Sequence, residues 1–529
     1  MKRRFKLFFG AMVIFSLCSL TSCDKVGEVL GKQSEERVYD GVIHALFVSP
    51  YDDVSLKNCF WLKSLALEQK IYVDWEVISA DEWEKCKQQR LESGEIPDIL
   101  INALESGDFV LYEGKFEDLA KHINYETPNI VKMFRETKDL HNIAALYSGE
   151  IFALPSYSAL TSQISASNSS KSVMFINQSW LKKVNLEPPK TFDDFEAVLR
   201  RFRVYDCNSD GDVSDEIPFD FHGFFGDSHS VFMLLSSFGL QFTDSGKDGY
   251  FMENRNVKSA YIDPRYKYLL EKLSRWYKEG LIREAALISS YSSFLDRSHG
   301  RKNGSALVGC VLGNEETAQF GANLASSYRV MLPPIATFEG EECNVKWSQD
   351  VFSVRENVLS ISAECPKKAE VMRFIDSMYS ADMSIYSLFG SSEFVEKRGN
   401  LDYEVKTNEK HLDSFGFSGP HFVEAGTLLS LPDPFTYALL ERTQYQKFAV
   451  NQGDFCPEIF LKYPHNQLKS LYALQLQINK EAKDFALQVI RGEKNIEEDW
   501  QSYEAKLINL GLEKAIASRQ AAYNRVFKK

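Results

Sequence analysis

The chain has 529 residues, more than one hydrophobic core usually holds, so we expect at least two substructures. Its hydrophobic fraction of 44% excludes a disordered polymer, and its net charge of −13 argues against a nucleic-acid partner. The cysteines after residue 23 are odd in number and scattered, with no CxxC spacing, which argues against a disulfide framework.

The N-terminal segment has the pattern of a secretory signal that ends at a lipidation cysteine. Four cations precede an apolar run over 7–20, and the tetrapeptide Leu20-Thr21-Ser22-Cys23 closes it. The run is shorter than the ~20 apolar residues that a membrane span requires. We therefore predict a signal peptide over 1–22 and a diacylglyceryl anchor on Cys23, followed by a flexible linker to residue 37. A signal that is cut without lipidation is the alternative.

Strands and helices are expected to alternate from residue 38 onward. Apolar runs rich in β-branched and aromatic residues predict strands over 41–48, 70–78, 97–104 and 173–178. Amphipathic stretches predict helices between and after these strands. One helix should open with a capping box of Thr191 and Asp194, another at Pro366, and two should end at Gly280 and Gly511. This alternation indicates an α/β architecture.

An acidic loop follows the capped helix, within residues 205–219. It carries oxygen donors at alternate positions and then a glycine, in the order Asp206, Asn208, Asp210 and Gly211. This is the oxygen spacing of a calcium-binding loop. A standard EF-hand would have a bidentate Glu at position 12, where this chain has Ile217 directly after Asp215 and Glu216. A standard EF-hand is therefore not expected, and a solvated acidic turn is the alternative.

Several segments, in their order along the chain, resemble the extracellular solute-binding protein family 1, especially its long LipO-like and alginate-binding-like lipoprotein members. The most specific is VMFINQSWLKKVNLEPPKTFDDFEAVL (173–199), which joins a strand, a short helix, a Pro-Pro turn and a capped helix. GEIFALPSY (149–157) is similar to the family's crossover segment, and ESGEIPDILIN (92–102) to its Pro-Asp strand start. The resemblance is weak over 386–430.

The resemblance implies an α/β, two-lobed periplasmic-binding-protein-like fold of type 2, with the ligand cleft between the lobes. By analogy, lobe one holds residues 38–155 and 352–428. Lobe two holds 156–351 and 429–529, including a calcium-type loop at 206–216. Ligand binding would then be complete only when both lobes touch the ligand, so closure would be a population shift.

The function that the resemblance implies is that of an extracytoplasmic solute-binding lipoprotein of an ABC importer. Such a protein would capture a carbohydrate, an oligosaccharide or uronate-like ligand, and deliver it to the transmembrane subunits of a permease. We expect a monomer without enzymatic activity, lipid-anchored at the outer face of the cytoplasmic membrane or in the periplasm.

The resemblance also implies a structural Ca²⁺ ion, because similar family members carry a calcium loop ending in Asp-Glu-Ile-Pro. The ligands carried over are the side chains of Asp206, Asn208, Asp210, Asp215 and Glu216 and the carbonyl of Asp212. The ion would stiffen a loop of lobe two rather than touch the transported ligand.

Carbohydrate sites combine aromatic rings, which cover the C–H faces of the sugar, with amides and carboxylates that bind its hydroxyls. Candidates of these types follow predicted strand ends in lobe one and the hinge: Tyr51, Asp52, Asn102, Glu105 and Tyr157. Those of lobe two and a later loop are Phe225, Asn314, Trp347 and Phe435. Each aromatic residue could instead be a lid on the core.

Two other functions stay open on the sequence. An acidic, aromatic-rich secreted chain could hydrolyse glycans with two carboxylates, although the chain has no G-x-S-x-G, H-E-x-x-H or G-x-x-x-x-G-K motif. A surface lipoprotein on the same fold could instead bind a protein or signalling partner.

Overall fold

The computed structural model describes most of the chain after residue 41. The described residues are 42–49, 60–159, 172–224, 229–242, 247–313, 316–347, 354–389, 394–406, 419–431, 441–448 and 458–527. All belong to one compact unit, residues 41–529. The predicted signal peptide, Cys23 and the linker lie outside the described residues.

A six-stranded sheet has the order β16-β4-β13-β3-β1-β2. Its strands are β1 (Val42–Ser49), β2 (Tyr72–Ser79), β3 (Ile99–Ile101), β4 (Ala153–Ser158), β13 (Val354–Ile361) and β16 (Phe422–Val423). β1 pairs in parallel with β2 and β3, whereas β13 runs antiparallel between β3 and β4. Strand β1 is buried over most of its length, as expected for a parallel strand covered on both faces.

Helices cover both faces of this sheet. They are α1 (Phe60–Glu68), α2 (Ala80–Ser93), α3 (Ser106–Leu111), α4 (Pro128–Glu136), α5 (Lys138–Ala144), α13 (Lys368–Met378) and α14 (Ala381–Phe389). Alternate residues of β1 enter two different cores, because successive side chains of a strand point to opposite faces. Phe47 packs in the cluster that contains Ile130 and Phe374, and Leu46 in the cluster of Trp83.

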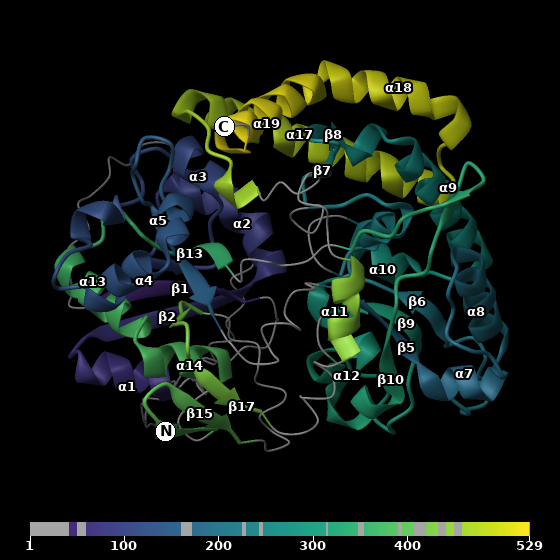
Figure 1. Ribbon diagram of the computed structural model, residues 1–529, viewed down its shortest axis with the longest axis horizontal. Helices are drawn as coiled ribbons and strands as arrows, with labels where there is room; N and C mark the ends of the chain where they lie inside the picture. Colours follow the sequence, from purple (N-terminus) through teal and green to yellow (C-terminus); the bar gives the residue numbers. More distant parts are fainter. Residues whose placement is uncertain are drawn as a thin grey trace, which may run out of the picture. The chain divides into compact units, whose positions relative to one another are not determined.

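A second sheet has the order β10-β5-β9-β6. Its strands are β5 (Val173–Asn177), β6 (Ile217–Asp220), β9 (Val308–Gly313) and β10 (Tyr328–Met331). β9 pairs antiparallel with β5 and parallel with β6. The helices around it are α7 (Gln178–Val184), α8 (Phe192–Val204), α9 (Pro264–Glu279), α10 (Glu284–Ile288), α11 (Tyr291–Ser298) and α12 (Glu316–Leu324). Helices α8 and α11 both contact β9 and lie on opposite sides of it in Figure 1.

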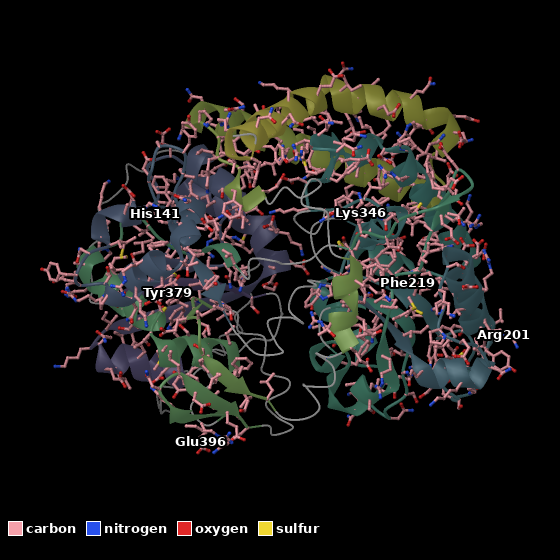
Figure 2. All side chains as sticks on the ribbon, viewed as in Figure 1. His141, Arg201, Phe219, Lys346, Tyr379 and Glu396 are labelled. Carbon is pink, nitrogen blue, oxygen red and sulfur yellow. The ribbon has the colours of Figure 1, made fainter. Side chains whose placement is uncertain are left out.

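Aromatic side chains fill the core of the second sheet. Trp276 stacks on Phe192 with ring centroids 5.7 Å apart, and Trp180 meets Phe202 edge to face at 5.3 Å. Figure 2 shows Phe219 inside this core and Tyr379 inside the core of the first sheet. Trp180 and Trp276 are both buried in this core.

Three C-terminal helices pack against one another: α17 (His465–Arg491), α18 (Ile496–Asn509) and α19 (Leu512–Phe527). Figure 1 shows them side by side in yellow. Helix α17 contacts α9, one of the helices around the second sheet, and also α3, one of the helices around the first sheet. α17 therefore physically joins elements that belong to different sheets. None of the described helices is both long enough and apolar enough to span a membrane.

A smaller sheet lies in the region where the resemblance is weak. Its strands β14 (Val395–Gly399), β15 (Asp402–Val405) and β17 (Leu428–Ser430) enclose a separate apolar cluster with α14. Two short hairpins complete the strands: β7 (Tyr250–Glu253) with β8 (Asn256–Ser259), and β11 (Thr337–Phe338) with β12 (Glu341–Glu342). Short 3₁₀ turns include η3 (Val231–Phe238) and η8 (Glu458–Phe460).

Most local signals in the sequence are confirmed. Thr191 and Asp194 form the predicted capping box of α8, and Gly280 ends α9 in the left-handed conformation. Helix α13 begins two residues after Pro366, at Lys368. Strand β3 is shorter than predicted, because Asn102 takes a left-handed conformation with φ of 57° and ends the strand. Among the described cysteines, Cys207, Cys310 and Cys343 are free thiols.

Candidate ligand-binding site

The first sheet gathers polar side chains at one edge. The parallel strands β1, β2 and β3 all finish at this edge, at Ser49, Ser79 and Ile101. β13 runs the opposite way, so it begins there, and β4 ends there because Tyr157 is the register partner of Val354. The predicted residues Asn102, Glu105 and Tyr157 therefore share the carboxyl edge of the sheet. Tyr51 and Asp52 lie outside the described residues.

Asn102 is held by β13 in a conformation that few non-glycine residues adopt. Its backbone N–H donates to the Val358 carbonyl at 2.8 Å, and its side-chain oxygen accepts from Arg355 Nη2 at 3.0 Å. Asn357 is also left-handed, with φ of 53°, and the register of β13 against β4 shifts between Arg355 and Leu359. Non-glycine residues in this conformation concentrate at functional sites. Arg355 and Asn357 are thus site candidates that the sequence did not reveal, since nothing in VRENV marks an irregular strand.

Glu105 places a negative charge at this edge, and neighbouring lysines compensate this charge. Its carboxylate pairs with Lys247 and accepts from the Tyr472 hydroxyl at 3.1 Å. Burial would raise the pKa of Glu105, but the positive charges of Lys247 and Lys87 outweigh that cost and lower the pKa to about 2. Glu105 therefore stays ionised at neutral pH. Through Lys247 it links α3 to the segment before β7, and through Tyr472 it links α3 to α17.

Tyr157 is half-buried at the end of β4 and stacks on Phe422, with ring centroids 6.1 Å apart. Its N–H donates to the His421 carbonyl at 3.0 Å. Partial burial raises the pKa of the Tyr157 hydroxyl, so the phenol remains a neutral hydrogen-bonding group. An aromatic ring in this position suits the apolar face of a sugar.

Trp347 was expected at the ligand site, and the structure corrects this expectation. Its ring is fully buried, and its indole N–H donates to the Ser172 carbonyl at 2.7 Å. The ring also meets Tyr445 edge to face at 5.5 Å. A buried ring with a satisfied N–H is a core residue and has no face for a ligand. The other predicted residues of this lobe and the later loop, Phe225, Asn314 and Phe435, lie outside the described residues.

The carboxyl edge of the second sheet carries a different set of groups. Strand β6 ends at the buried Asp220, which accepts from Arg297 Nε at 2.7 Å and from its Nη2 at 3.2 Å. Burial raises the pKa of Asp220, and the Arg297 guanidinium opposes that rise. His222 follows two residues later and packs edge to face on Tyr291, with ring centroids 5.3 Å apart. The aromatic-rich segment FDFHGFF (219–225), which contains the predicted Phe225, is the sequence signal that could have identified Asp220 and His222.

A hydrogen bond joins a residue beside the carboxyl edge of the second sheet to a residue beside that of the first. The backbone N–H of Tyr291, at the start of α11, donates to Asp81 Oδ2 at 3.1 Å. Asp81 lies in the first turn of α2, directly after β2 ends. The start of α11 therefore contacts the carboxyl edge of the first sheet at the end of β2.

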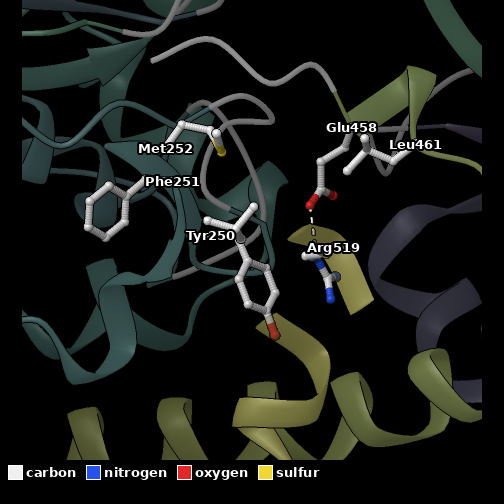
Figure 3. A pocket seen from close by; sticks show the side chains of 7 residues that line it. Tyr250, Phe251, Met252, Glu458, Leu461 and Arg519 are labelled. Carbon is white, nitrogen blue, oxygen red and sulfur yellow. Dashed lines mark hydrogen bonds and ion pairs between the residues drawn. The ribbon is translucent and has the colours of Figure 1, made fainter. Parts of the chain in front are cut away.

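A small pocket lies elsewhere, between β7, β8, η8 and α19 (Figure 3). It is lined by Tyr250, Phe251, Met252, Val257, Glu458, Leu461 and Arg519. Arg519 Nε donates to Glu458 Oε1 at 3.0 Å, and its guanidinium lies 3.8 Å from the centroid of the Tyr250 ring. These partners make the pocket part of a packed network, and it contains none of the predicted site residues.

The acidic loop folds as a tight turn before β6. Asp206 accepts from the backbone N–H groups of Asp210 and Gly211 at 3.2 and 3.1 Å. Asn208 Nδ2 lies 3.3 Å from both carboxylate oxygens of Asp215. Asp212 Oδ1 accepts two hydrogen bonds from Ser214, one from its backbone N–H at 2.9 Å and one from its hydroxyl at 2.6 Å.

Glu216 gives the loop a buried negative charge. The residue is fully buried, and its Oε1 accepts from the backbone N–H of Cys207 at 2.8 Å. Its Oε2 is buried without a hydrogen-bond partner. Burial raises the pKa of Glu216, against the effect of its backbone hydrogen bonds. An unpaired buried carboxylate oxygen is costly unless a cation or a proton satisfies it.

Arg301 partly supplies the missing positive charge. Its Nη1 lies 3.1 Å from Asp210 Oδ2, and its Nη2 lies 2.5 Å from Asp215 Oδ2. Within the described residues, no cluster of three or more His, Cys, Asp or Glu stands close enough to hold a metal ion. The donors are nevertheless the hard oxygens that Ca²⁺ prefers, and Glu216 Oε2 lacks a partner. The loop thus has the chemistry of a calcium site, with an arginine across two of its carboxylates.

Comparison with known proteins defines the class to which this architecture belongs. No known family profile matches the chain. The fructooligosaccharide ABC transporter substrate-binding protein FusA of Streptococcus pneumoniae is 25% identical over 492 residues, covering 88% of this chain and 86% of FusA. Lipoprotein LipO of Bacillus subtilis is 23% identical over 380 residues, 69% of each chain.

Solved structures agree. An HMO-binding ABC-transporter-associated solute-binding protein from Bifidobacterium longum infantis is 25% identical and superposes with a TM-score of 0.73, covering 92% of this chain and 99% of that chain. FusA in complex with kestose gives a TM-score of 0.76 at 20% identity, with the same coverage. The alginate-binding protein AlgQ2 without calcium ion gives 0.69 at 18% identity, covering 92% of this chain and 98% of that chain.

The fold is therefore the two-lobed α/β fold of the extracellular solute-binding proteins. Within that class, the chain is a homologue of ABC transporter substrate-binding proteins, in agreement with the resemblance found in the sequence.

Proposed function

We propose that this chain is the extracytoplasmic binding protein of an ABC importer and that it captures an oligosaccharide. The single observation that carries the proposal is the match to a fructooligosaccharide-binding protein over 88% of this chain. Solved relatives include structures in complex with kestose and with Man5GlcNAc, so relatives on this fold accept different oligosaccharides. Their common chemistry is a chain of sugar rings rich in hydroxyl groups.

The groups at the two sheet edges suit such a ligand. Asn102 and Arg355 offer an amide and a guanidinium to sugar hydroxyls, and Tyr157 offers a ring to a C–H face. These groups lie at the edge of the first sheet, whereas the aromatic rings of His222 and Tyr291 lie at the edge of the second sheet. A ligand would therefore be fully bound only when both edges contact it. Ligand would then favour the lobe arrangement in which both edges touch it.

We assign residues 38–155 and 352–428 to lobe one, and 156–351 and 429–529 to lobe two. The strands support this division apart from the end of β4, which extends to Ser158. The first sheet takes its strands from 42–158, 354–361 and 422–423, and the second sheet takes its strands from 173–331. Helix α17 contacts both groups of elements, as a connecting element of a hinge would.

The proposed protein binds and releases its ligand without chemical change, like its relatives, and passes it to the permease as a monomer. A lipid on Cys23 would keep it at the membrane, in support of which the sequence shows a short apolar run followed directly by Leu-Thr-Ser-Cys.

A calcium ion in the acidic loop is part of the proposal. It would be held by Asp206, Asn208, Asp210, Asp215 and Glu216, with the carbonyl of Asp212. Calcium supplies a divalent charge that satisfies several oxygens at once. In this chain, the buried Oε2 of Glu216 has most to gain. Arg283 ties the loop to the lobe by donating to the carbonyls of Ser214 and Glu216 at 2.7 and 2.8 Å.

Thermal unfolding of the mature lipoprotein in detergent tests ligand capture. Kestose, nystose, Man5GlcNAc, alginate oligosaccharides and a set of short peptides would each be added. A true ligand at a hundredfold excess over its Kd stabilises the folded state by ~2.7 kcal/mol. We expect at least one saccharide, and no peptide, to raise Tm. Peptide-only stabilisation, or none from any saccharide, would contradict oligosaccharide capture.

The calcium site has its own test. Calcium should raise Tm of the wild type but not of Glu216→Gln, which loses the charge of the buried carboxylate. Asp212→Asn is the matched control, because its side chain bonds Ser214 and only its carbonyl is proposed as a ligand. A wild type without any calcium response would reduce the loop to an acidic turn, and a response that survives Glu216→Gln would exclude Glu216 as a ligand.

A further inference from the structure

Helix α11 places an aromatic cluster at the carboxyl edge of the second sheet. Tyr291, its first residue, is half-buried and lies between two histidines. His222 is edge-on to it, and the ring centroids of His229 and Tyr291 are 5.1 Å apart at an angle of 63°. Tyr291 Oη lies 3.4 Å from His229 Nε2, and the buried Phe294 packs at 5.8 Å behind the tyrosine.

Hydrogen bonds of Arg297 and Ser298 hold the helix that carries Tyr291 in place. Arg297 holds the buried Asp220 at the end of β6 and also donates to Ser289 Oγ at 3.1 Å. At the helix end, Gln319 donates to Ser298 Oγ at 2.7 Å in a fully buried contact. These anchors fix the position of the Tyr291 ring before any ligand arrives, which reduces the entropy cost of binding.

The start of helix α11, which carries the cluster's tyrosine, contacts a residue that follows the first sheet. Tyr291 N–H reaches Asp81 Oδ2 at 3.1 Å, and Asp81 follows the carboxyl end of β2. Asn102 and Tyr157 stand at that same edge. Tyr291 therefore stands on a helix end that contacts the carboxyl edge of the first sheet, and its half-buried ring packs partly against the core of the second sheet.

We propose that Tyr291 is the stacking platform of the second lobe and that His222 and His229 hold its ring in place. The inference rests on the proposed function and names the residue that recognises a sugar ring. A tyrosine ring covers the C–H face of a pyranose or furanose, and the neighbouring imidazole nitrogens suit hydroxyls at the edge of that sugar. The ligand class is thus an oligosaccharide with at least one ring that has an apolar face.

A structural role alone makes a different prediction from the platform. If Tyr291 merely covered Phe294, its loss would lower Tm and leave saccharide affinity unchanged. If it is the platform, removal of the ring weakens binding more than it changes stability, and loss of the hydroxyl alone has little effect. Three substitutions at this position separate these cases: Tyr291→Ala, Tyr291→Leu and Tyr291→Phe.

Isothermal titration calorimetry of the mature lipoprotein with kestose, and with Man5GlcNAc where kestose does not bind, tests the platform. We expect Tyr291→Ala and Tyr291→Leu to weaken binding roughly tenfold or more, and Tyr291→Phe to stay within about threefold of the wild type. Tyr291→Leu keeps the volume over Phe294, so it remains informative if the alanine variant unfolds. Tyr125→Ala, at a tyrosine that is 89% exposed, is the control and should bind like the wild type.

The outcomes separate the two proposals. If the wild type binds a saccharide and Tyr291→Leu binds it within twofold, the platform is overturned while oligosaccharide capture stands. If the wild type binds neither saccharide, both proposals fail for these ligands, because the platform has no sugar to hold.

Discussion

His421 is a single buried group whose charge state affects the whole fold. It lies beside β4, where its N–H donates to Ser156 Oγ at 3.1 Å and its Nδ1 lies 2.9 Å from the Gly419 carbonyl. Burial lowers the pKa of His421 to about 4, and the nearby charge of Arg355 adds to that effect. The folded protein therefore keeps this imidazole neutral under conditions in which an unfolded chain would protonate it.

The stability of the protein should accordingly fall as the pH is lowered. A histidine with a depressed folded pKa stabilises the protein fully above its unfolded pKa, near 6.5. That contribution is lost between about pH 6.5 and 4 and amounts to roughly 3 kcal/mol. His421→Asn should flatten this part of the curve of unfolding free energy against pH, measured by urea denaturation. An unchanged slope in the variant would assign the pH dependence to other groups.

Arg301 should control how strongly the acidic loop depends on calcium. Without calcium, its guanidinium is the cation nearest to Asp210 and Asp215, so Arg301→Gln should lower Tm in the presence of a chelator. With calcium, the same substitution removes a competing charge, and we expect about tenfold tighter calcium binding by calorimetry. Arg201→Gln is the control, because this exposed arginine stacks on Tyr205 near the loop. Equal calcium affinity in wild type and Arg301→Gln would contradict the competition.

The position of helix α3 against α17 depends on a glycine, Gly107. Glu105 and Asp108 form a capping box at its start, which local sequence can encode. Gly107 has another reason to be small, because a Cβ atom there would lie 2.2 Å from the ring of Tyr472 on α17. The close approach lets the Tyr472 hydroxyl reach Glu105, so the contact between α3 and α17 depends on this glycine.

Gly107→Ala should therefore separate α3 from α17. We expect a loss of roughly 1–3 kcal/mol in unfolding free energy, the usual cost of overpacking. Gly399→Ala is the matched control, since its added Cβ would meet nothing closer than 3.6 Å. Both can be measured by chemical denaturation, and an alanine variant at 107 as stable as the one at 399 would show that Tyr472 moves aside freely.

Across the whole molecule, Arg519 connects distant parts of the chain. From α19 it donates to Glu458 Oε1 and, at 3.1 Å, to Asp248 Oδ2 before β7 (Figure 3 shows the Glu458 contact). Although burial opposes the charged form, the carboxylates of Glu458 and Asp248 raise the pKa of Arg519 above its ordinary value. Lys247, next to Asp248, in turn pairs with Glu105 of the first sheet's surroundings.

Arg519→Met should destabilise the protein strongly, because it leaves two carboxylates without their buried partner. Removal of one partner from such a network costs ~3–5 kcal/mol. Arg525→Met, on the same helix, should change stability by no more than about 0.5 kcal/mol, because Arg525 donates an exposed hydrogen bond to the Lys462 carbonyl. Equal Tm values for the two variants would contradict the role of Arg519.

Features that depend on neighbours along the chain are predictable from the sequence. The capping box of Thr191 and Asp194 and the glycine end of α9 involve partners within a few residues, so their patterns survive without a fold. The turn that carries Asp206, Asn208 and Asp210 is local in the same way. The family was readable for a related reason, since several such local patterns occur in a specific order.

The binding edges depend on partners that are far apart in sequence. Asn102 meets Arg355 because β3 pairs with β13, and Tyr291 meets Asp81 across 210 residues. Trp347 was misassigned for this reason: its burial depends on Ser172 and Tyr445, which no local pattern connects to it. A strand end in the sequence marks where a side chain can be presented. Strand order and long-range packing then determine whether that side chain faces the ligand or the core.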